Sequence, residues 1–440
     1  MRYAATGVAA VLLVAAGTGW AVYEKLNGNI TADEAAAREL ARYEKERPTA
    51  LVRGAQNILL IGSDSRSGHG NAGYGRDSGT ERSDTTILLH LAADRRSATA
   101  VSLPRDLMVR VPGCRRPDGT RSRAAFTLFN HAFETGGSAC TIRTVEKLTD
   151  IRIDHHMVVD FNGFKEMVDA VDGVDVCLPK PIDDKDAKLR LPAGRVRLDG
   201  EQALGYVRAR KSIGDGSDTD RMDRQQRFLG ALAEKVRSND VLLNPVKLYP
   251  VLDAATSSLT TDPALASLRG LYDLVRGLRG IPTERMQFLT VPRTSYVSDP
   301  NRDQLVRAPA EQLFARLRSD TPVRVAERSA GDGAGSGDRV SGDRARDHAP
   351  RDRASGDPAG TTEAAGTGRA ADSPARPTGT AAPRDLLTES YTYSYDNYGD
   401  PDGPLGTDGK PGAGPPGGRA DAPDPTPTFR GNTAAEDTCG

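Results

Sequence analysis

The chain has 440 residues with 59 basic and 60 acidic side chains, so its formal net charge at pH 7 is -1. This balance gives no general attraction to nucleic acid, and the sequence shows no recognition helix, basic repeat or alternation of aromatic and basic residues. The composition varies strongly along the chain, and we expect only one sizeable hydrophobic core.

The first segment predicts a membrane anchor. Residues 3–22 carry no charged side chain, and this is about the length that crosses a bilayer as a helix. The alternative is a cleaved signal peptide. However, Arg2 is the one basic residue before the apolar segment, and no clear cleavage site of small residues follows it. We assign residues 1–25 to a cytoplasmic start and a transmembrane anchor. Under the positive-inside tendency, a single-pass protein of the cell membrane would have everything after Lys25 outside the cell.

Residues 26–50 predict a helical stalk next to the membrane. Thr31 and Glu34 have the spacing of a capping box, and a run rich in Ala and charged residues continues to Glu46. Pro48 would end the helix.

Three consecutive strands are predicted over residues 57–62, 85–91 and 98–103. The turn between the second and third strands is short, so these two should form an antiparallel hairpin. This hairpin would bring Arg105, just after the third strand, beside Asp84, just before the second. If the first strand is also an antiparallel neighbour of the second, Asp64 arrives at the same edge of the sheet.

Two carboxylates and one guanidinium at one sheet edge suit a metal ion and a phosphate group. Mg²⁺ is usually held by one or two carboxylates, with waters and substrate phosphates completing the shell, and Arg matches phosphate oxygens bidentately. Mn²⁺ would accept the same ligands. The alternative stays open on these segments alone: Asp64 and Asp84 could be turn-forming and capping residues, and Arg105 a surface charge.

From residue 51 to about residue 239, strand and helix patterns alternate, and further elements follow. Helices are predicted near 140–148, 162–171, 265–278 and 310–318, and strands at 157–161, 174–178 and 286–291. These elements predict an α/β domain with α-β-α layers, in which helices cover both faces of a central mixed sheet. We place this domain at residues 51–322, with its motifs in 51–239.

The remaining residues, 323–440, are dominated by small, polar and charged side chains with few aliphatic core formers, and they predict a disordered tail. Four cysteines are compatible with disulfides in an exported protein. Cys114 and Cys140 flank a segment with loop character and are our best guess for a pair. Cys177 lies in an apolar strand and could equally be a buried free thiol.

A second group of basic residues lies between residues 204 and 227. Residues 204–211 predict a strand on which Arg208 and Arg210 project to the same face. Two parallel guanidiniums repel each other unless an anion lies between them.

A helix is predicted to begin at Asp220, with this residue as its N-cap. Arg221, Arg224 and Gln225 then share one helix face. Arginines in the first turn oppose the helix dipole, which favours a bound anion at this helix start. The alternative is a solvated charged face balanced by Asp220 and Asp223.

Five motifs occur in order, at residues 57–66, 82–85, 102–106, 206–211 and 220–226. Together they resemble the LytR-CpsA-Psr (LCP) family over roughly residues 51–239. The resemblance implies an extracytoplasmic transferase that moves a glycopolymer, such as teichoic acid, from a polyprenyl-pyrophosphate carrier onto peptidoglycan through a phosphodiester bond. It also implies a hydrophobic channel for the prenyl chain, with the helix at 162–171 in its wall.

The resemblance also implies a role for each motif residue. Asp64 and Asp84 would hold Mg²⁺. The resemblance does not identify a general base, for which Asp64 is a candidate if it is not fully committed to the metal. The residues that would bind the pyrophosphate are Arg82, Arg105, Arg208, Arg210, Arg221, Arg224 and Gln225. The alternatives are a transcriptional attenuator of envelope genes and a polyprenyl-pyrophosphate phosphohydrolase that does not transfer the polymer.

Overall fold

The computed structural model describes residues 2–63, 83–185, 187–209, 218–237, 245–326 and 428–435. Asp64, Arg82 and Arg210 lie outside these residues. All elements below belong to one compact unit, whose residues fall within 1–335 and 424–440.

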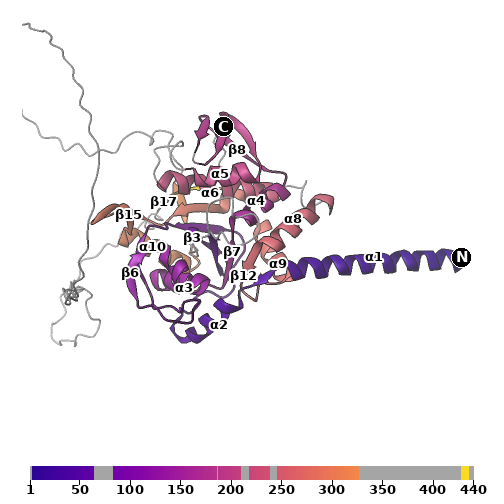
Figure 1. The fold of residues 1–440 in the computed structure, drawn as a ribbon, viewed down its shortest axis with the longest axis horizontal. Helices are drawn as coiled ribbons and strands as arrows, with labels where there is room; N and C mark the ends of the chain where they lie inside the picture. The colour runs from indigo at the N-terminus through magenta and orange to yellow at the C-terminus, as the bar shows by residue number, and fades with distance from the viewer. Residues whose placement is uncertain are drawn as a thin grey trace, which may run out of the picture. The chain divides into compact units, whose positions relative to one another are not determined.

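A nine-stranded mixed sheet forms the centre of this unit (Figure 1). Its order is β1 (Thr31–Ala32), β12 (Leu259–Thr261), β7 (His155–Val159), β2 (Gln56–Ser63), β3 (Ser83–Leu91), β4 (Ala98–Leu103), β13 (Met286–Thr290), β17 (Thr428–Thr433) and β16 (Arg324–Ala326). β3 pairs antiparallel with both β2 and β4, while β7 and β13 extend the sheet in parallel. The three predicted strands and their pairing are confirmed.

Helices cover both faces of this sheet, as predicted. Leu59, Leu88 and Val101 face a core shared with α2 (Glu34–Arg42), α3 (His131–Thr149) and α10 (Arg307–Arg318). Ile58 and Ile87 face the opposite core, which includes residues of α6 (Asp218–Arg237) and α9 (Leu268–Arg279). The central strands are therefore nearly continuous apolar runs, because both of their faces are buried.

Smaller elements complete the unit around the sheet. They are β5 (Met108–Val111), β6 (Ala125–Leu128), α4 (Phe161–Ala170), β8 (Val174–Leu178), β9 (Ile182–Asp184), β10 (Leu189–Leu191), β11 (Gly194–Leu198), α5 (Gly200–Arg208), α8 (Pro245–Ser258), β14 (Arg293–Tyr296) and β15 (Asp299–Leu305). Val168, Leu198 and Phe228 form a separate core that joins α4, the β8–β11 pair and α6.

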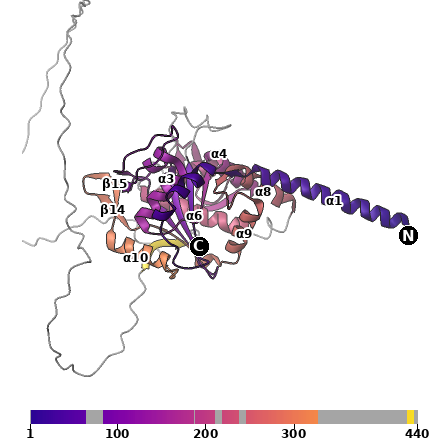
Figure 2. The ribbon, with the colours of Figure 1, turned by 90° about the horizontal axis from the view of Figure 1, so that it is seen from below.

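The N-terminal region forms one long helix. A helix, α1 (Arg2–Asn29), forms there, and Figures 1 and 2 show its C-terminal end beside α8 and α9. The Lys25 amine donates to the Tyr249 hydroxyl of α8 at 2.9 Å. The sequence predicted a transmembrane helix in this region; in the part of the chain that the structure describes, no helix is sufficiently long and apolar to cross a membrane.

A helix forms within residues 26–50, as predicted, but the segment packs on the domain and is not one continuous helical stalk. β1 begins this segment and pairs with β12, and the N-cap of the next helix is Asp33, whose carboxylate accepts from the Ala36 amide at 2.9 Å. Ala36 and Leu40 lie four residues apart on one face of α2 and are buried in the main core. This apolar pair draws the helix onto the domain. The chain then ends the helix at Arg42 and forms the short helix η1 (Glu44–Glu46).

The disordered tail predicted over residues 323–440 is wrong at two places. β16 begins at Arg324, and β17 inserts between β13 and β16 close to the end of the sequence. Phe429 is 6% exposed in the main core. A single buried aromatic in a polar context gives almost no periodic signal, which is why the strand was missed. The rest of the predicted tail lies outside the described residues.

The predicted disulfide between Cys114 and Cys140 is present. Cys177 in β8 is also disulfide-bonded, so the alternative of a free thiol at this position is wrong.

Candidate functional site

The hairpin of β3 and β4 places one acidic and one basic side chain together at the edge of the sheet. The Arg105 Nη1 atom donates to Asp84 Oδ1 at 2.8 Å, and Arg105 Nε donates to Asp106 Oδ2 at 3.2 Å. The side chains of Arg105 and Asp84 are 19% and 34% exposed, so the pair is partly desolvated but can still be reached from solvent. The structure therefore brings Arg105 beside Asp84, as the hairpin predicted.

Neighbouring backbone fixes the loop that carries Arg105. The Asn130 amide, at the start of α3, donates to the Arg105 carbonyl at 3.1 Å, and the Asp303 amide donates to the Asp106 carbonyl at 3.1 Å. Asp303 in turn is ion-paired with Arg293 across the β14–β15 hairpin. The backbone that carries Arg105 is therefore held on two sides, and Asp84 and Asp106 orient its guanidinium, which suits a group that must meet a ligand in one orientation.

The strand predicted over residues 204–211 is wrong, because residues up to Arg208 belong to the helix α5. Asp199 and Gln202 form a reciprocal capping box at its start. This N-terminal signal outweighs the β-prone residues Tyr206 and Val207. Arg208 and Arg210 therefore do not share a strand face, and Arg210 lies outside the described residues.

Arg208, the last residue of α5, lies over an aromatic ring. Its guanidinium carbon is 4.4 Å from the ring centroid of Phe161, the first residue of α4. Phe161 follows closely after the end of β7, whose Val159 pairs with Gly62 of β2. Arg208 is thereby anchored at the same edge of the sheet as Asp84 and Arg105.

The start of α6 packs against the end of α5. The helix begins at Asp218, so Asp220 lies inside it and is not the predicted N-cap. The Arg224 Nη2 atom donates to the Ala209 carbonyl, and Gln225 Nε2 donates to the Val207 carbonyl at 3.2 Å.

Two of the predicted pyrophosphate-binding residues on α6 are buried. Arg221 is 5% exposed and Arg224 is 4% exposed. Burial lowers the pKa of Arg224 from its ordinary value, with Tyr206 and nearby acids acting in the opposite direction, but an Arg guanidinium stays charged at neutral pH. Asp184, Asp220 and Asp223 lie close enough to Arg224 to favour its charged form.

Gln226 connects the helical and strand parts of the site. Its Nε2 atom donates to Ser102 Oγ of β4 at 3.1 Å and to Thr290 Oγ1 of β13 at 3.0 Å. Ser102 lies three residues before Arg105, so α6 reaches the sheet edge at which the Asp84–Arg105 pair lies. Sequence reasoning missed Asp106, Phe161 and Gln226, although Asp106 and Gln226 lie within or next to the quoted motifs.

Asp84 is the one predicted metal ligand that the structure describes, because Asp64 lies outside the described residues. No cluster of three or more His, Cys, Asp or Glu side chains that could hold a metal occurs in the described residues. A partly exposed carboxylate beside a guanidinium still fits a Mg²⁺ ion that takes most of its ligands from water and phosphate.

Comparisons with known proteins agree with this architecture. The model of the LytR_cpsA_psr family matches residues 23–318. The "Probable cell wall biosynthesis protein LcpB" of Corynebacterium glutamicum is 37% identical over 271 residues, which cover 60% of this chain and 61% of that protein. The chain thus spans less than two thirds of that relative.

Two further similarities concern one relative and one solved structure. The polyisoprenyl-teichoic acid–peptidoglycan teichoic acid transferase TagT of Bacillus subtilis is 31% identical over 287 residues, covering 62% of this chain and 81% of that protein. The crystal structure of protein gbs0355 from Streptococcus agalactiae matches with a TM-score of 0.51 at 22% identity, covering 60% of this chain and 87% of that chain. The structural match supports the fold alone.

Proposed function

Because the chain belongs to the LytR_cpsA_psr family, we propose that it transfers a glycopolymer from a polyprenyl-pyrophosphate carrier to peptidoglycan. The observation that carries this proposal is the Asp84–Arg105 pair, held at the sheet edge where α5 and α6 deliver further guanidiniums. The name of TagT describes the same kind of transfer for that protein.

The proposed reaction is a phosphoryl transfer. A hydroxyl oxygen of the acceptor attacks the phosphorus that bears the glycan, a new phosphodiester forms, and the bond to the carrier phosphate breaks. The hydroxyl proton passes to a base, for which Asp64 is our candidate, and the polyprenyl monophosphate leaves. Such reactions require mainly positioning and neutralisation of the charge that develops on oxygen.

The chain's own side chains supply that neutralisation in our proposal. Arg105 is oriented by Asp84 and Asp106, so its guanidinium can meet the phosphate without first reorganising. Arg208 is oriented by the Phe161 ring, and Arg210, Arg82 and Arg221 are proposed to complete the contacts. Arg224 and Gln225 bind the end of α5, so we propose that they position Arg208 and also add positive potential.

We propose that Asp84, together with Asp64, holds a Mg²⁺ ion when the donor is bound. The ion would neutralise part of the charge of the diphosphate. We also propose that the domain works outside the cell membrane, where its acceptor is found. A reporter enzyme fused after residue 440 tests this location. Activity of a reporter that works only in the cytoplasm would contradict it.

The test of the activity is reconstitution. The full chain is incubated with a lipid-pyrophosphate-linked glycopolymer, an uncross-linked peptidoglycan strand and Mg²⁺, and the products are identified by mass spectrometry. The proposal requires a glycopolymer joined to peptidoglycan through phosphate. Release of free polymer without any joined product would instead identify a phosphohydrolase.

A further inference from the structure

A cavity of about 880 Å³ opens at the same sheet edge, between α2, α3 and the start of α4. Ser63, the last residue of β2, lines it and pairs with Ser83, which precedes Asp84. The cavity therefore borders the position of the Asp84–Arg105 pair. Its volume lies within the range of ligand sites in proteins.

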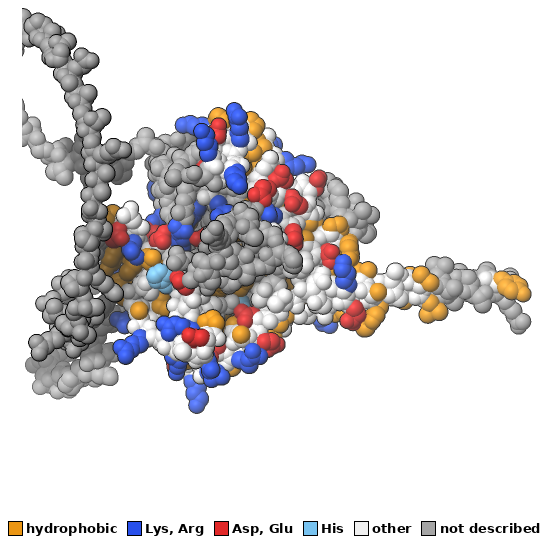
Figure 3. Space-filling view, in the orientation of Figure 1, with side chains coloured by type: hydrophobic (Ala, Val, Ile, Leu, Met, Phe, Trp, Pro, Cys, Tyr) orange, Lys and Arg blue, Asp and Glu red, His pale blue; other side chains and the backbone are white. Residues whose placement is uncertain are grey.

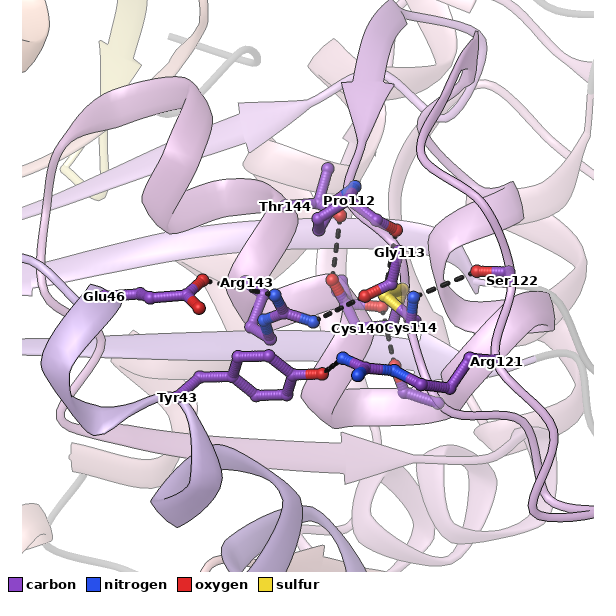
Figure 4. The surroundings of a disulfide bond; sticks show 12 residues. Tyr43, Glu46, Pro112, Gly113, Cys114, Arg121, Ser122, Cys140, Arg143 and Thr144 are labelled. Carbon is purple, nitrogen blue, oxygen red and sulfur yellow. Dashed lines mark hydrogen bonds and ion pairs between the residues drawn. A yellow bond between two sulfur atoms is a disulfide. The ribbon is translucent and has the colours of Figure 1, made fainter.

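One wall of the cavity is a loop fixed by the disulfide, which Figure 4 shows with its surroundings. Cys114 immediately precedes Arg115, a lining residue, and is bonded to Cys140 of α3. At Gly136, an added Cβ would lie 2.8 Å from the Arg115 carbonyl, so only glycine lets the loop approach α3 this closely. A covalent bond and a close backbone contact thus hold this wall in place.

Arg143 reinforces the same wall. Its side chain is 7% exposed, its Nη1 atom donates to the Gly113 carbonyl at 2.8 Å, and its guanidinium carbon lies 3.4 Å from the Tyr43 ring centroid (Figure 4). Tyr43 directly follows α2, so these contacts join two of the elements that enclose the cavity. The cavity is pre-formed, which lowers the entropic cost of binding a ligand.

The lining carries both signs of charge together with hydroxyl groups. Basic side chains gather over α2 and α3 in the lower part of Figure 3. Among the lining residues, Arg38 and Arg115 are cationic, and Glu39 and Glu166 are anionic. The Ser258 hydroxyl donates to Glu166 at 3.3 Å. A ligand that matches this surface has many hydroxyls, and both carboxylates and amino groups, which describes a glycan with attached peptides.

The α2–α3 wall of the cavity and the α6 arginines lie on opposite faces of the sheet, whereas the α4 wall of the cavity shares a core with α6. α2 and α3 belong to the core on one face of the sheet, and α6 belongs to the core on the other. In a phosphoryl transfer, the attacking and leaving oxygens lie roughly in line on opposite sides of the phosphorus. An acceptor held against the α2–α3 wall would therefore approach from the side away from the α6 arginines.

We propose that this cavity binds the acceptor, a glycan segment of peptidoglycan with its peptides. The inference rests on the proposed transfer. It adds a location for the second substrate, and it assigns the Cys114–Cys140 disulfide the role of holding the acceptor wall.

Direct binding tests the assignment without requiring transfer. The acceptor probe is a fluorescein-labelled, uncross-linked fragment of two disaccharide-peptide units, measured by fluorescence anisotropy. The donor probe is geranylgeranyl pyrophosphate with Mg²⁺, measured by calorimetry. Ala35 is exposed and lines the cavity, so Ala35→Trp fills space without disturbing the core. A second variant, Arg38→Glu with Arg115→Glu, changes the charge of the lining instead.

We expect each variant of the full chain to raise the Kd for the acceptor probe by about tenfold or more, with less than a twofold change for the donor probe. The matched control is Arg269→Glu on α9, whose side chain is 87% exposed, and it should change neither Kd. Unchanged acceptor binding in both cavity variants overturns the assignment. Cavity variants that weaken binding of the donor probe but not of the acceptor probe overturn it as well.

The same experiment separates this inference from the proposed function. If the wild-type chain binds the acceptor fragment in the cavity but never yields a joined product, the proposed transfer fails and the binding site stands. If joined product forms and the KM for the acceptor is unchanged in both cavity variants, the binding site fails and the transfer stands.

Discussion

The two halves of the candidate site are built in different ways. Asp84 and Arg105 are placed by the β3–β4 hairpin, whose ladder fixes their register residue by residue. Arg208 and Arg224 are placed by helices, and their positions depend on a stacked ring, on a carbonyl at the end of α5 and on the packing of α6.

This difference has a consequence for robustness. A hairpin register is a local property that sequence patterns specify strongly. A helix position depends on several distant contacts, including the approach of Ala434, just after β17, to Gly230 of α6. We call Asp84 and Arg105 the strand half of the site, and Arg208 and Arg224 the helical half. We expect the strand half to lose function only when one of its own side chains is changed. The helical half should also be sensitive to substitutions far from the site.

The largest effect should come from Arg105. Arg105→Ala removes a pre-oriented charge-assisted contact to the diphosphate and should lower kcat/KM for transfer by about 10³-fold. The midpoint of thermal unfolding should stay close to that of the wild type, because the side chain is partly exposed. Arg269→Ala is the matched control, and near-normal transfer by Arg105→Ala would remove the strand half from the site.

Phe429 tests the contribution of β17 to the fold that carries the site. Phe429→Ala leaves a cavity in the main core beside β13 and should lower the free energy of unfolding by about 3 kcal/mol, measured by urea denaturation. The exposed neighbour Thr428→Ala is the control and should change it by less than about 0.5 kcal/mol. Equal stability of the two variants would mean that the Phe429 side chain contributes nothing to the core.

Arg208 tests the helical half at the site itself. Arg208→Ala should raise the Kd for geranylgeranyl pyrophosphate by about tenfold, because one charge-assisted phosphate contact is lost. Phe161→Leu keeps the guanidinium and removes only the aromatic face beneath it, so its effect should be smaller. A larger effect in Phe161→Leu than in Arg208→Ala would show that the ring acts mainly through the fold.

The smallest effect concerns Asp33, at the cavity. Burial raises the pKa of its carboxyl, but hydrogen bonds with His156, Ala36 and Ser138 outweigh burial, so the folded-state pKa is lower than the ordinary value. The ionised carboxylate therefore stabilises the fold above the unfolded-state pKa. This contribution is lost as the pH falls below about 4 and through the lowered pKa.

Asp33→Asn keeps a capping side chain and removes the charge. It should lower the free energy of unfolding by about 1 kcal/mol at pH 7, and the difference from wild type should shrink in acid. Glu34→Gln, on an exposed neighbour, is the control. A difference that is the same at pH 7 and pH 3 would contradict the role of the charge.

The sequence predicted the strands β2 to β4, their pairing and the layered fold correctly, because apolar runs and a short turn specify strands locally. It failed for residues 204–211, where β-prone side chains hid a helix whose signal was the pair Asp199 and Gln202. It also failed for β17, since a strand of six residues at the end of a long polar stretch is specified by its partners β13 and β16. Tertiary pairing of this kind leaves no periodic pattern to read.

The central claim is that both halves bind one diphosphate, and the affinity for geranylgeranyl pyrophosphate with Mg²⁺ tests it most directly. Calorimetry on the wild type, Arg105→Ala and Arg208→Ala should show that each variant weakens binding by about tenfold or more. Weakened binding in only one of the two variants would contradict the account, because the strand half and the helical half would then not meet at a single ligand.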